Sequence, residues 1–277
     1  MADLAAYRVI EREPLRVRYR DRILLTNPPP TFGGALLAVA LTRLDRHGPP
    51  PPAGSPELAA LLAATMAGVD ADRRAGHPEV LAALAGDGGD DPRARPQVNR
   101  GTTHVTVADV DGNVAAMTTS NGECSGDVVD GIGVACNNML GEDDLHPDGF
   151  HAAPPGERVA SMMSPTFVLD ASGAHVELAL GSGGSKRIRS ALLQVLVAAV
   201  DHDTPLADAV DAPRIHWDED HLEVEPGLAP DVLAALAEVG RVNVWPDRSM
   251  YFGGVHAVAP GRVGAGDARR GGSVRVV

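Results

Sequence analysis

The stretch RGTTHVTVADVDGN, residues 100–113, places two threonines and a histidine directly after a glycine in the middle of the chain. Residues 103–108 and 114–119 are rich in β-branched and apolar residues and favour strands. Asp111-Gly112 between them is a strong signal for a hairpin turn. The stretch therefore predicts an antiparallel hairpin that begins just after Gly101.

Apolar periodicity and turn residues predict further helices and strands on both sides of this hairpin. The expected helices cover residues 33–44, 56–68, 77–85, 188–201, 205–211 and 230–239, and the expected strands cover 22–27, 166–169, 175–180, 253–258 and 261–265. Strands packed under helices indicate a layered α+β domain. Residues 86–101 are rich in Gly, Asp, Pro and Arg, so we expect an exposed, mobile linker there.

The composition excludes several classes of protein. With 277 residues and 44% hydrophobic content, the chain can bury a core as one large domain or two small ones. A net charge of −13 argues against a nucleic-acid partner. No apolar run is long enough to cross a bilayer. The first 20 residues lack the apolar core of an export signal, so the default expectation is a cytoplasmic location.

Thr102 is a candidate nucleophile. A threonine hydroxyl reacts poorly by itself, but a threonine at a chain N-terminus carries a base in its own α-amine, which titrates near ~7.7–8.0. An internal threonine gains this amine only if the preceding bond is cleaved, and Gly101 offers no side chain to obstruct attack on that bond. The alternative is that Thr102 and Thr103 simply begin a strand, which the dipeptide alone favours.

Two further motifs could complete a site around Thr102. The sequence TTSN, residues 118–121, ends the second hairpin strand, so Thr119 and Asn121 can bring hydrogen-bonding groups beside Thr102. The sequence GSGGS, residues 181–185, lies between an expected strand and helix and offers backbone N–H groups for an oxyanion or another anion. A nucleotide phosphate loop is the competing interpretation, but the glycine spacing does not match its patterns.

Other polar residues are less specific. The acidic loop NNMLGEDDL, residues 137–145, could hold a substrate ammonium group or could be an ordinary solvated loop. The pairs His146/His151 and His216/His221 lack the helical spacing of a zinc site, so no metal is expected. Cys124 and Cys136 form neither a CxxC pair nor a disulfide framework.

Taken in order, these segments resemble the γ-glutamyltranspeptidase family of N-terminal-nucleophile hydrolases. The matching segments are DLAAYRVIEREPLRVRYRD, NPPPTFGG, TTHVTVADVDGN, TTSN, NNMLGEDDL, SMMSPT, GSGGSKRIRSALLQVL, DAPRIH and FGGVHAV. The resemblance runs from about Asp3 to Gly272. It implies an αββα sandwich, of which this chain is the C-terminal half of the usual precursor and which is incomplete without the upstream half.

The resemblance also implies a role for each matching residue. Thr102 is the expected nucleophile, freed by autoproteolysis at Gly101–Thr102, which divides the chain into a large-subunit part, 1–101, and a small-subunit part, 102–277. Thr119 is expected to form a hydrogen bond with the nucleophile, and Gly183 and Gly184 are expected to donate N–H groups to the oxyanion. Asn121 and Ser161 are expected to hold the α-carboxylate of the donor. Asp144, with Glu142 as helper, is expected to bind the α-amino group of the donor.

The implied reaction is transfer of a γ-glutamyl group, from glutathione or a related amide, through a threonine ester to water or an amino acid. It needs no cofactor. The expected partners are the small-molecule donor and acceptor, together with the upstream half as a separate chain or a second copy in a homo-oligomer. Two alternatives stay open, an acylase with a different acyl donor and a truncated, non-catalytic homologue.

Overall fold

The computed structural model describes residues 5–75, 101–146, 149–150, 152 and 154–277. In these ranges six strands form one sheet in the order β1-β2-β7-β8-β12-β13, with every neighbouring pair antiparallel. Their bounds are β1 Leu15–Tyr19, β2 Arg22–Thr26, β7 Thr166–Leu169, β8 Val176–Gly183, β12 Gly254–Ala259 and β13 Val263–Gly266. The helix expected at 77–85 and nearly all of the linker expected at 86–101 lie outside the described residues.

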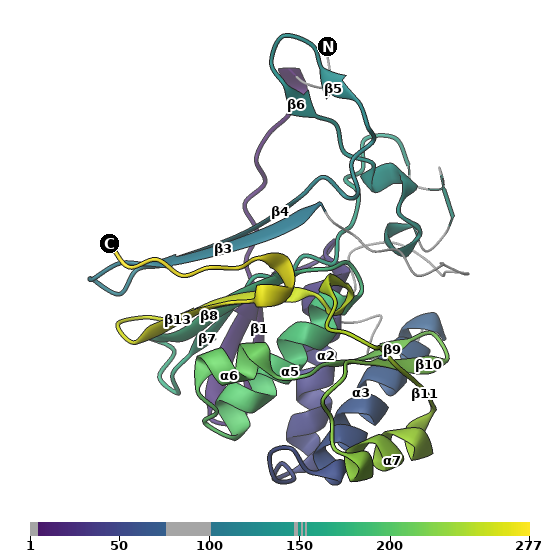
Figure 1. Ribbon diagram of the computed structural model, residues 1–277. Helices are drawn as coiled ribbons and strands as arrows, with labels where there is room; N and C mark the ends of the chain where they lie inside the picture. Colours follow the sequence, from purple (N-terminus) through teal and green to yellow (C-terminus); the bar gives the residue numbers. More distant parts are fainter. Residues whose placement is uncertain (1–4, 76–100, 147–148, 151, 153) are drawn as a thin grey trace.

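Helices cover one face of this sheet (Figure 1). They are α2 Phe32–His47, α5 Arg187–Asp201 and α6 Leu206–Asp211. Helix α3, Pro56–Arg74, packs against α2, and α7, Pro230–Val239, packs against α3. The apolar run of α5 is buried, with Leu192, Val195 and Leu196 fully enclosed in the same core as Leu180 of β8. Helix and sheet therefore bury complementary apolar faces, which confirms the layered α+β architecture expected from the sequence.

A smaller sheet packs beside α3 and α7. It contains β9 Ile215–Asp218, β10 His221–Val224 and β11 Arg241–Val244, in the order β11-β10-β9. Short 3₁₀ turns lie at Met139–Gly141, Asp143–Leu145, Met250–Phe252 and Ala268–Arg270, and β5 Val128–Val129 pairs with β6 Val134–Ala135. Cys124 and Cys136 are both free thiols.

The hairpin of β3, Thr102–Ala108, and β4, Val114–Ser120, lies on the other face of the main sheet, over β8 and β12 (Figure 1). Its turn is closed by Asp109, whose Oδ1 accepts hydrogen bonds of 2.9 Å from the backbone N–H groups of Asp111 and Asn113. The last strand pair is Ala108 with Val114, so the loop is longer than the two residues of the tightest hairpins.

His104 attaches this hairpin to the sheet. Its ring is buried between the hydroxyls of Thr118, 2.8 Å from Nδ1, and Thr106, 2.7 Å from Nε2. A Cβ on Gly181 of β8 would lie 2.2 Å from the ring, so the glycine makes room for it. Burial, with a smaller contribution from His256, lowers the pKa of His104 to about 4, so the ring is neutral.

The opposite face of the hairpin is exposed and apolar. Side chains alternate along a strand, so residues next to the buried Thr102 and His104 point outward. Val105, Val107 and Met117 are 46%, 58% and 58% exposed, and β3 and β4 pair only with each other within the described part of the chain. The second sheet of the sandwich is therefore represented here by one hairpin.

None of the helices in the described ranges is long and apolar enough to cross a membrane.

Candidate active site

Thr102 begins β3 and is 6% exposed. Its Oγ1 lies 2.8 Å from Oγ of Ser120, the residue opposite it in the hairpin register. The Ser120 oxygen also accepts a 3.0 Å hydrogen bond from the N–H of Gly122. The candidate nucleophile is thus held by a hydroxyl group that is itself oriented by the backbone.

Thr119 does not occupy the position expected for it. It pairs with Thr103, and both are exposed on the outer face of the hairpin. Successive side chains of a strand point to opposite faces, so Thr119 cannot reach the buried hydroxyl of Thr102. The predicted hydrogen bond from Thr119 to the nucleophile is therefore wrong, and Ser120 forms this contact instead.

Asn121 contacts the site through its backbone N–H group. Its N–H donates a 3.1 Å hydrogen bond to the carbonyl oxygen of Gly101. Its side chain is exposed, with Nδ2 3.5 Å from the carbonyl oxygen of Ala135. The expected role of the Asn121 side chain in holding a carboxylate stays a prediction.

Gly183 and Gly184 lie beside the nucleophile, at the end of β8. A Cβ on Gly183 would be 2.7 Å from the carbonyl oxygen of Thr102, so only glycine allows this approach. Gly184 has φ +125°, in the region that favours glycine, and its Cβ would be 2.9 Å from Cα of Gly253. Helix α5 begins at Arg187, three residues after Gly184, as the motif predicted.

Arg270 brings a positive charge to these glycines, which sequence reasoning missed. Its Nη1 lies 3.2 Å from the position of a Gly183 Cβ, and its Nη2 lies 3.4 Å from that of a Gly184 Cβ. Burial, followed by repulsion from Arg187, lowers the pKa of Arg270 to about 10. No signal in the sequence links this arginine near the C-terminus to GSGGS.

A buried ionic cluster holds the segment that carries Arg270. Nη2 of Arg214 lies 2.5 Å from Oδ2 of Asp267, and Nη2 of Arg269 lies 2.6 Å from Oε2 of Glu225. Asp267 also accepts a hydrogen bond of 2.9 Å from the N–H of Val255 in β12. Because all four charged groups are buried and paired, the segment is fixed against the sheet.

The acidic loop, residues 137–145, also contacts the GSGGS segment. Ser185 donates a short hydrogen bond to Oδ2 of Asp144. Glu142 is 6% exposed, and burial, followed by repulsion from Asp144 and Glu123, raises its pKa to about 7. A Cβ on Gly122 would lie 2.3 Å from Oε1 of Glu142, so this carboxyl group occupies the space beside the loop that orients Ser120.

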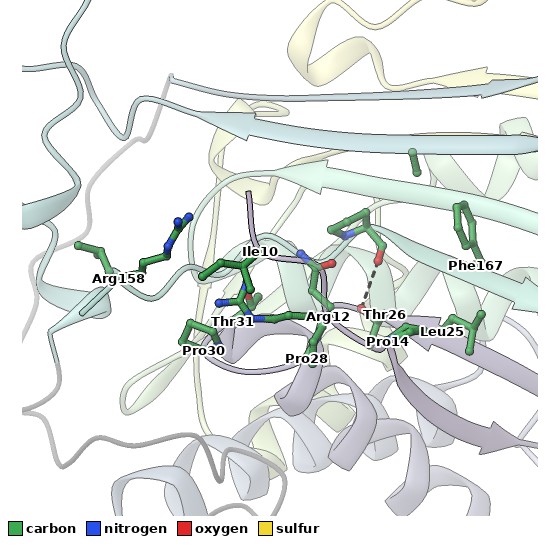
Figure 2. A pocket seen from close by; sticks show the side chains of 14 residues that line it. Ile10, Arg12, Pro14, Leu25, Thr26, Pro28, Pro30, Thr31, Arg158 and Phe167 are labelled. Atoms are coloured by element: carbon green, nitrogen blue, oxygen red, sulfur yellow. Dashed lines mark hydrogen bonds between the residues drawn. The ribbon is translucent and has the colours of Figure 1, made fainter. Parts of the chain in front are cut away.

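Ser161 lies apart from this cluster in the hydrogen-bond network. Its Oγ is 3.3 Å from Oγ1 of Thr31, and its carbonyl oxygen accepts a 2.8 Å hydrogen bond from the N–H of Phe32. Thr31 lines a pocket of about 520 Å³, together with Arg12 and Arg158 (Figure 2). In the part of the chain that the structure describes, no hydrogen bond joins Ser161 to Thr102 or to the acidic loop.

Three histidines of the two sequence pairs have structural contacts. His216 is buried, with Nδ1 2.6 Å from Oγ of Ser190, and His221 lies between Asp220 and Glu223. Nε2 of His146 is 3.1 Å from the carbonyl oxygen of Met139. His151 lies outside the described residues.

Comparison with known proteins identifies relatives across most of the chain. Residues 90–277 match the sequence profile of the family described as Gamma-glutamyltranspeptidase. The chain is 32% identical over 282 residues to the Acylase ACY 1 proenzyme of a Pseudomonas species, covering 93% of this chain and 50% of that protein. It is 30% identical over 306 residues to the Glutathione hydrolase proenzyme of Escherichia coli, covering 90% of this chain and 52% of that protein.

A solved structure extends this likeness to the fold. The cephalosporin acylase from Bacillus halodurans matches with a TM-score of 0.78 and 24% identity, over 99% of this chain and 55% of that one. At this identity the match shows a shared fold, the αββα sandwich of N-terminal-nucleophile hydrolases. The chain spans about half the length of the curated relatives it matches.

Proposed function

The chain belongs to the gamma-glutamyltranspeptidase family, and from this premise we propose that it cleaves itself at Gly101–Thr102 and then uses Thr102 as a nucleophile in acyl transfer. The observation that carries the proposal is the 2.8 Å contact between Oγ1 of Thr102 and Oγ of Ser120, beside Gly183. It supports a hydroxyl that is buried, oriented and next to candidate oxyanion donors.

The proposed turnover begins with the α-amine that cleavage releases. The neutral amine accepts the hydroxyl proton as Oγ1 of Thr102 attacks the donor amide carbon. Gly183 and Gly184 donate N–H groups to the tetrahedral oxyanion, the C–N bond breaks, and the amine returns the proton to the leaving group. Water or an amino acid then takes the acyl group from the threonine ester.

The proposed donor is a γ-glutamyl amide. Its α-ammonium group pairs with Asp144, with Glu142 beside it, and its α-carboxylate is held near Asn121 and Ser161. The paired carboxyl groups next to GSGGS support this choice, because an ammonium group relieves the repulsion between them. The second candidate is an acylase whose acyl group lacks the ammonium, supported by the name of the Pseudomonas relative.

The proposed partner is a polypeptide that corresponds to the other half of these relatives. It would pair with the edges of β3 and β4 and cover Val105, Val107 and Met117. The exposed apolar face of the hairpin supports this arrangement, and so do its edges, which pair with no further strand in the described residues. Cleavage would leave residues 1–101 and 102–277 associated, because strands from both parts lie in one sandwich.

The first test is an intact mass of the purified chain, with Thr102→Ala as control, alone and after co-expression with the other half. Fragments meeting at Gly101–Thr102 only in the wild type support self-cleavage, and an uncut wild type under both conditions contradicts it. Matured protein is then assayed with a γ-glutamyl anilide and with the glutaryl anilide, which lacks only the α-amino group. Faster cleavage of the γ-glutamyl compound supports the first candidate, and the reverse supports the acylase.

A further inference from the structure

We propose that the backbone N–H of Asn121 stabilises the oxyanion that forms on Gly101 during self-cleavage. The chain would thus mature with an oxyanion donor different from Gly183 and Gly184, the donors for turnover. This inference rests on the proposed function, because it concerns the cleavage that frees Thr102. The N–H of Asn121 already lies 3.1 Å from the Gly101 oxygen in the intact chain.

The hairpin register explains this geometry. In an antiparallel pair of strands, residues opposite each other alternate between hydrogen-bonded pairs and pairs whose side chains lie closer together. Gly101 and Asn121 extend the ladder as a hydrogen-bonded pair. Thr102 and Ser120 form the next pair, in which the hydroxyls meet. In this register, the Asn121 N–H polarises the scissile carbonyl group of Gly101 and the Ser120 hydroxyl orients the attacking hydroxyl of Thr102.

This arrangement requires glycine at position 101, because there is no room for a side chain. A Cβ on Gly101 would lie 1.9 Å from the carbonyl oxygen of Gly122, a backbone atom that has no flexible side chain to move. A larger residue at 101 must push the Gly122 loop away and lengthen the bond from Asn121. The glycine before the nucleophile thus keeps the scissile carbonyl group within reach of its donor.

Self-cleavage needs only the Thr102 hydroxyl, the Thr102 nitrogen and a water molecule. Oγ1 of Thr102 attacks the carbonyl carbon of Gly101, and the carbonyl electron pair moves to the oxygen that faces Asn121. The hydroxyl proton passes to the Thr102 nitrogen as the C–N bond breaks, which leaves a free amine and an ester between Gly101 and Thr102. Water hydrolyses this ester, giving the Gly101 carboxyl group and the Thr102 hydroxyl.

The two sets of donors lie on different sides of the nucleophile. Asn121 contacts the carbonyl group before Thr102 in the chain, whereas Gly183 approaches the carbonyl group of Thr102 itself. The Gly101 carbonyl exists as an amide only before cleavage. A change in the Asn121 N–H should therefore affect maturation while leaving the turnover donors in place.

The test replaces the N–H by an ester oxygen in the full chain. Asn121→Ala is compared with its ester analogue, in which lactic acid stands at position 121, so that the pair differs only in the backbone donor. The cleavage rate of Asn121→Ala is the reference for its ester analogue. Loss of one oxyanion donor should slow the ester analogue by about 10²–10³-fold.

A second pair of variants controls for loss of a ladder hydrogen bond. Met117→Ala and its lactic acid analogue change a backbone N–H in an equivalent pair, opposite Val105 and away from the scissile bond. Both should cleave at similar rates. In addition, Gly101→Ala should slow cleavage, whereas Gly68→Ala, where only the flexible end of Arg43 comes within 3.3 Å, should not.

The outcomes separate this inference from the proposed function. A wild type that cleaves and an Asn121 ester analogue that cleaves equally fast would overturn the role of Asn121 and leave self-cleavage standing. Equal slowing of the Asn121 and Met117 ester analogues would also overturn it, since the effect would then be general to the ladder. A wild type that never cleaves, even with the other half present, would overturn both proposals.

Discussion

The hydroxyl oxygens of Thr102 and Ser120 lie 2.8 Å apart, while Thr119, the neighbour of Ser120, faces the opposite side of the hairpin. The contact depends on register. Thr102 and Ser120 occupy a pair in which the side chains approach each other, and the Gly122 N–H fixes the serine oxygen from the other side. Ser120, rather than Thr119, is the hydroxyl that can orient the candidate nucleophile.

Ser120→Ala should therefore slow self-cleavage and turnover, whereas Thr119→Ala should leave both nearly unchanged. Removing a buried hydrogen-bond partner costs about 1–3 kcal/mol, which corresponds to roughly 5- to 160-fold in rate. Ser120→Thr restores a hydroxyl and should recover most of the loss. The measurements are the cleavage rate by intact mass and kcat/KM of the matured protein. Equal effects of the two alanine variants would contradict this assignment.

Glu142 should make the folded protein less stable as the pH rises. Its pKa is raised to about 7 in the folded state, chiefly by burial, so the folded protein holds this proton more tightly than the unfolded chain. The stabilisation is present below the ordinary glutamate pKa and is lost as pH rises through 7. One unit of pKa corresponds to about 1.4 kcal/mol, so the wild type should lose about 1–3 kcal/mol between pH 5 and 8 through this group.

The measurement is urea denaturation at pH 5 and pH 8 in a Thr102→Ala background, which prevents cleavage. Glu142→Gln has no such titration, so its free energy of unfolding should fall less between the two values. Buried neutral histidines such as His104 act in the opposite direction, and the difference between the two proteins removes their contribution. An unchanged pH dependence in the variant would show that Glu142 is ionised across this range.

Local sequence signals predicted the fold well where strands and helices carry clear apolar patterns. The junction at GSGGS is an example, since β8 ends at Gly183 and α5 begins at Arg187. The small sheet was missed because its strands β9 and β10 are four residues each and contain His216, Asp218 and Glu223 among their apolar residues. Short, partly charged segments become strands here because neighbouring helices bury one side of them.

The site was predicted less completely because it depends on register and on distant contacts. A turn centred on Asp111-Gly112 does not fix the register, and the observed pairing of Ala108 with Val114 encloses a longer loop. A one-residue change in register moves every side chain to the other face, which is why Thr119 was chosen in place of Ser120. Arg270 was missed because only the folded sheet brings β12 and the C-terminal segment beside β8.

The outer face of the hairpin should make the chain aggregate when it is expressed by itself. Val105, Val107 and Met117 form an exposed apolar strip on a hairpin whose two edges are open among the residues that the structure describes. Val105→Thr combined with Met117→Thr should reduce aggregation of the isolated chain, measured by light scattering. The same variant should bind the other half more weakly in co-purification, because the strip is the proposed contact. Reduced aggregation with undiminished binding would place the contact elsewhere.

Arg270 should lower the pKa of the α-amine that serves as the base. Its guanidinium group and the Thr102 carbonyl oxygen both lie within 3.2 Å of the position of a Gly183 Cβ, so a partly buried positive charge lies close to the N-terminal residue. A nearby like charge disfavours the ammonium form and keeps the amine neutral at lower pH. The acidic limb of the kcat/KM profile should therefore move to higher pH in Arg270→Met and return towards the wild type in Arg270→Lys.

Methionine is the appropriate neutral replacement, because the aliphatic part of Arg270 packs on Gly254 and a long side chain preserves that contact. The profiles are measured on matured protein, so that cleavage does not limit the rate, and at two salt concentrations. A partly buried charge is screened by salt less than an exposed one, so most of the shift should persist. A uniform loss of kcat/KM with an unmoved acidic limb would mean that Arg270 acts on the oxyanion at Gly183 and Gly184, and not on the amine of Thr102.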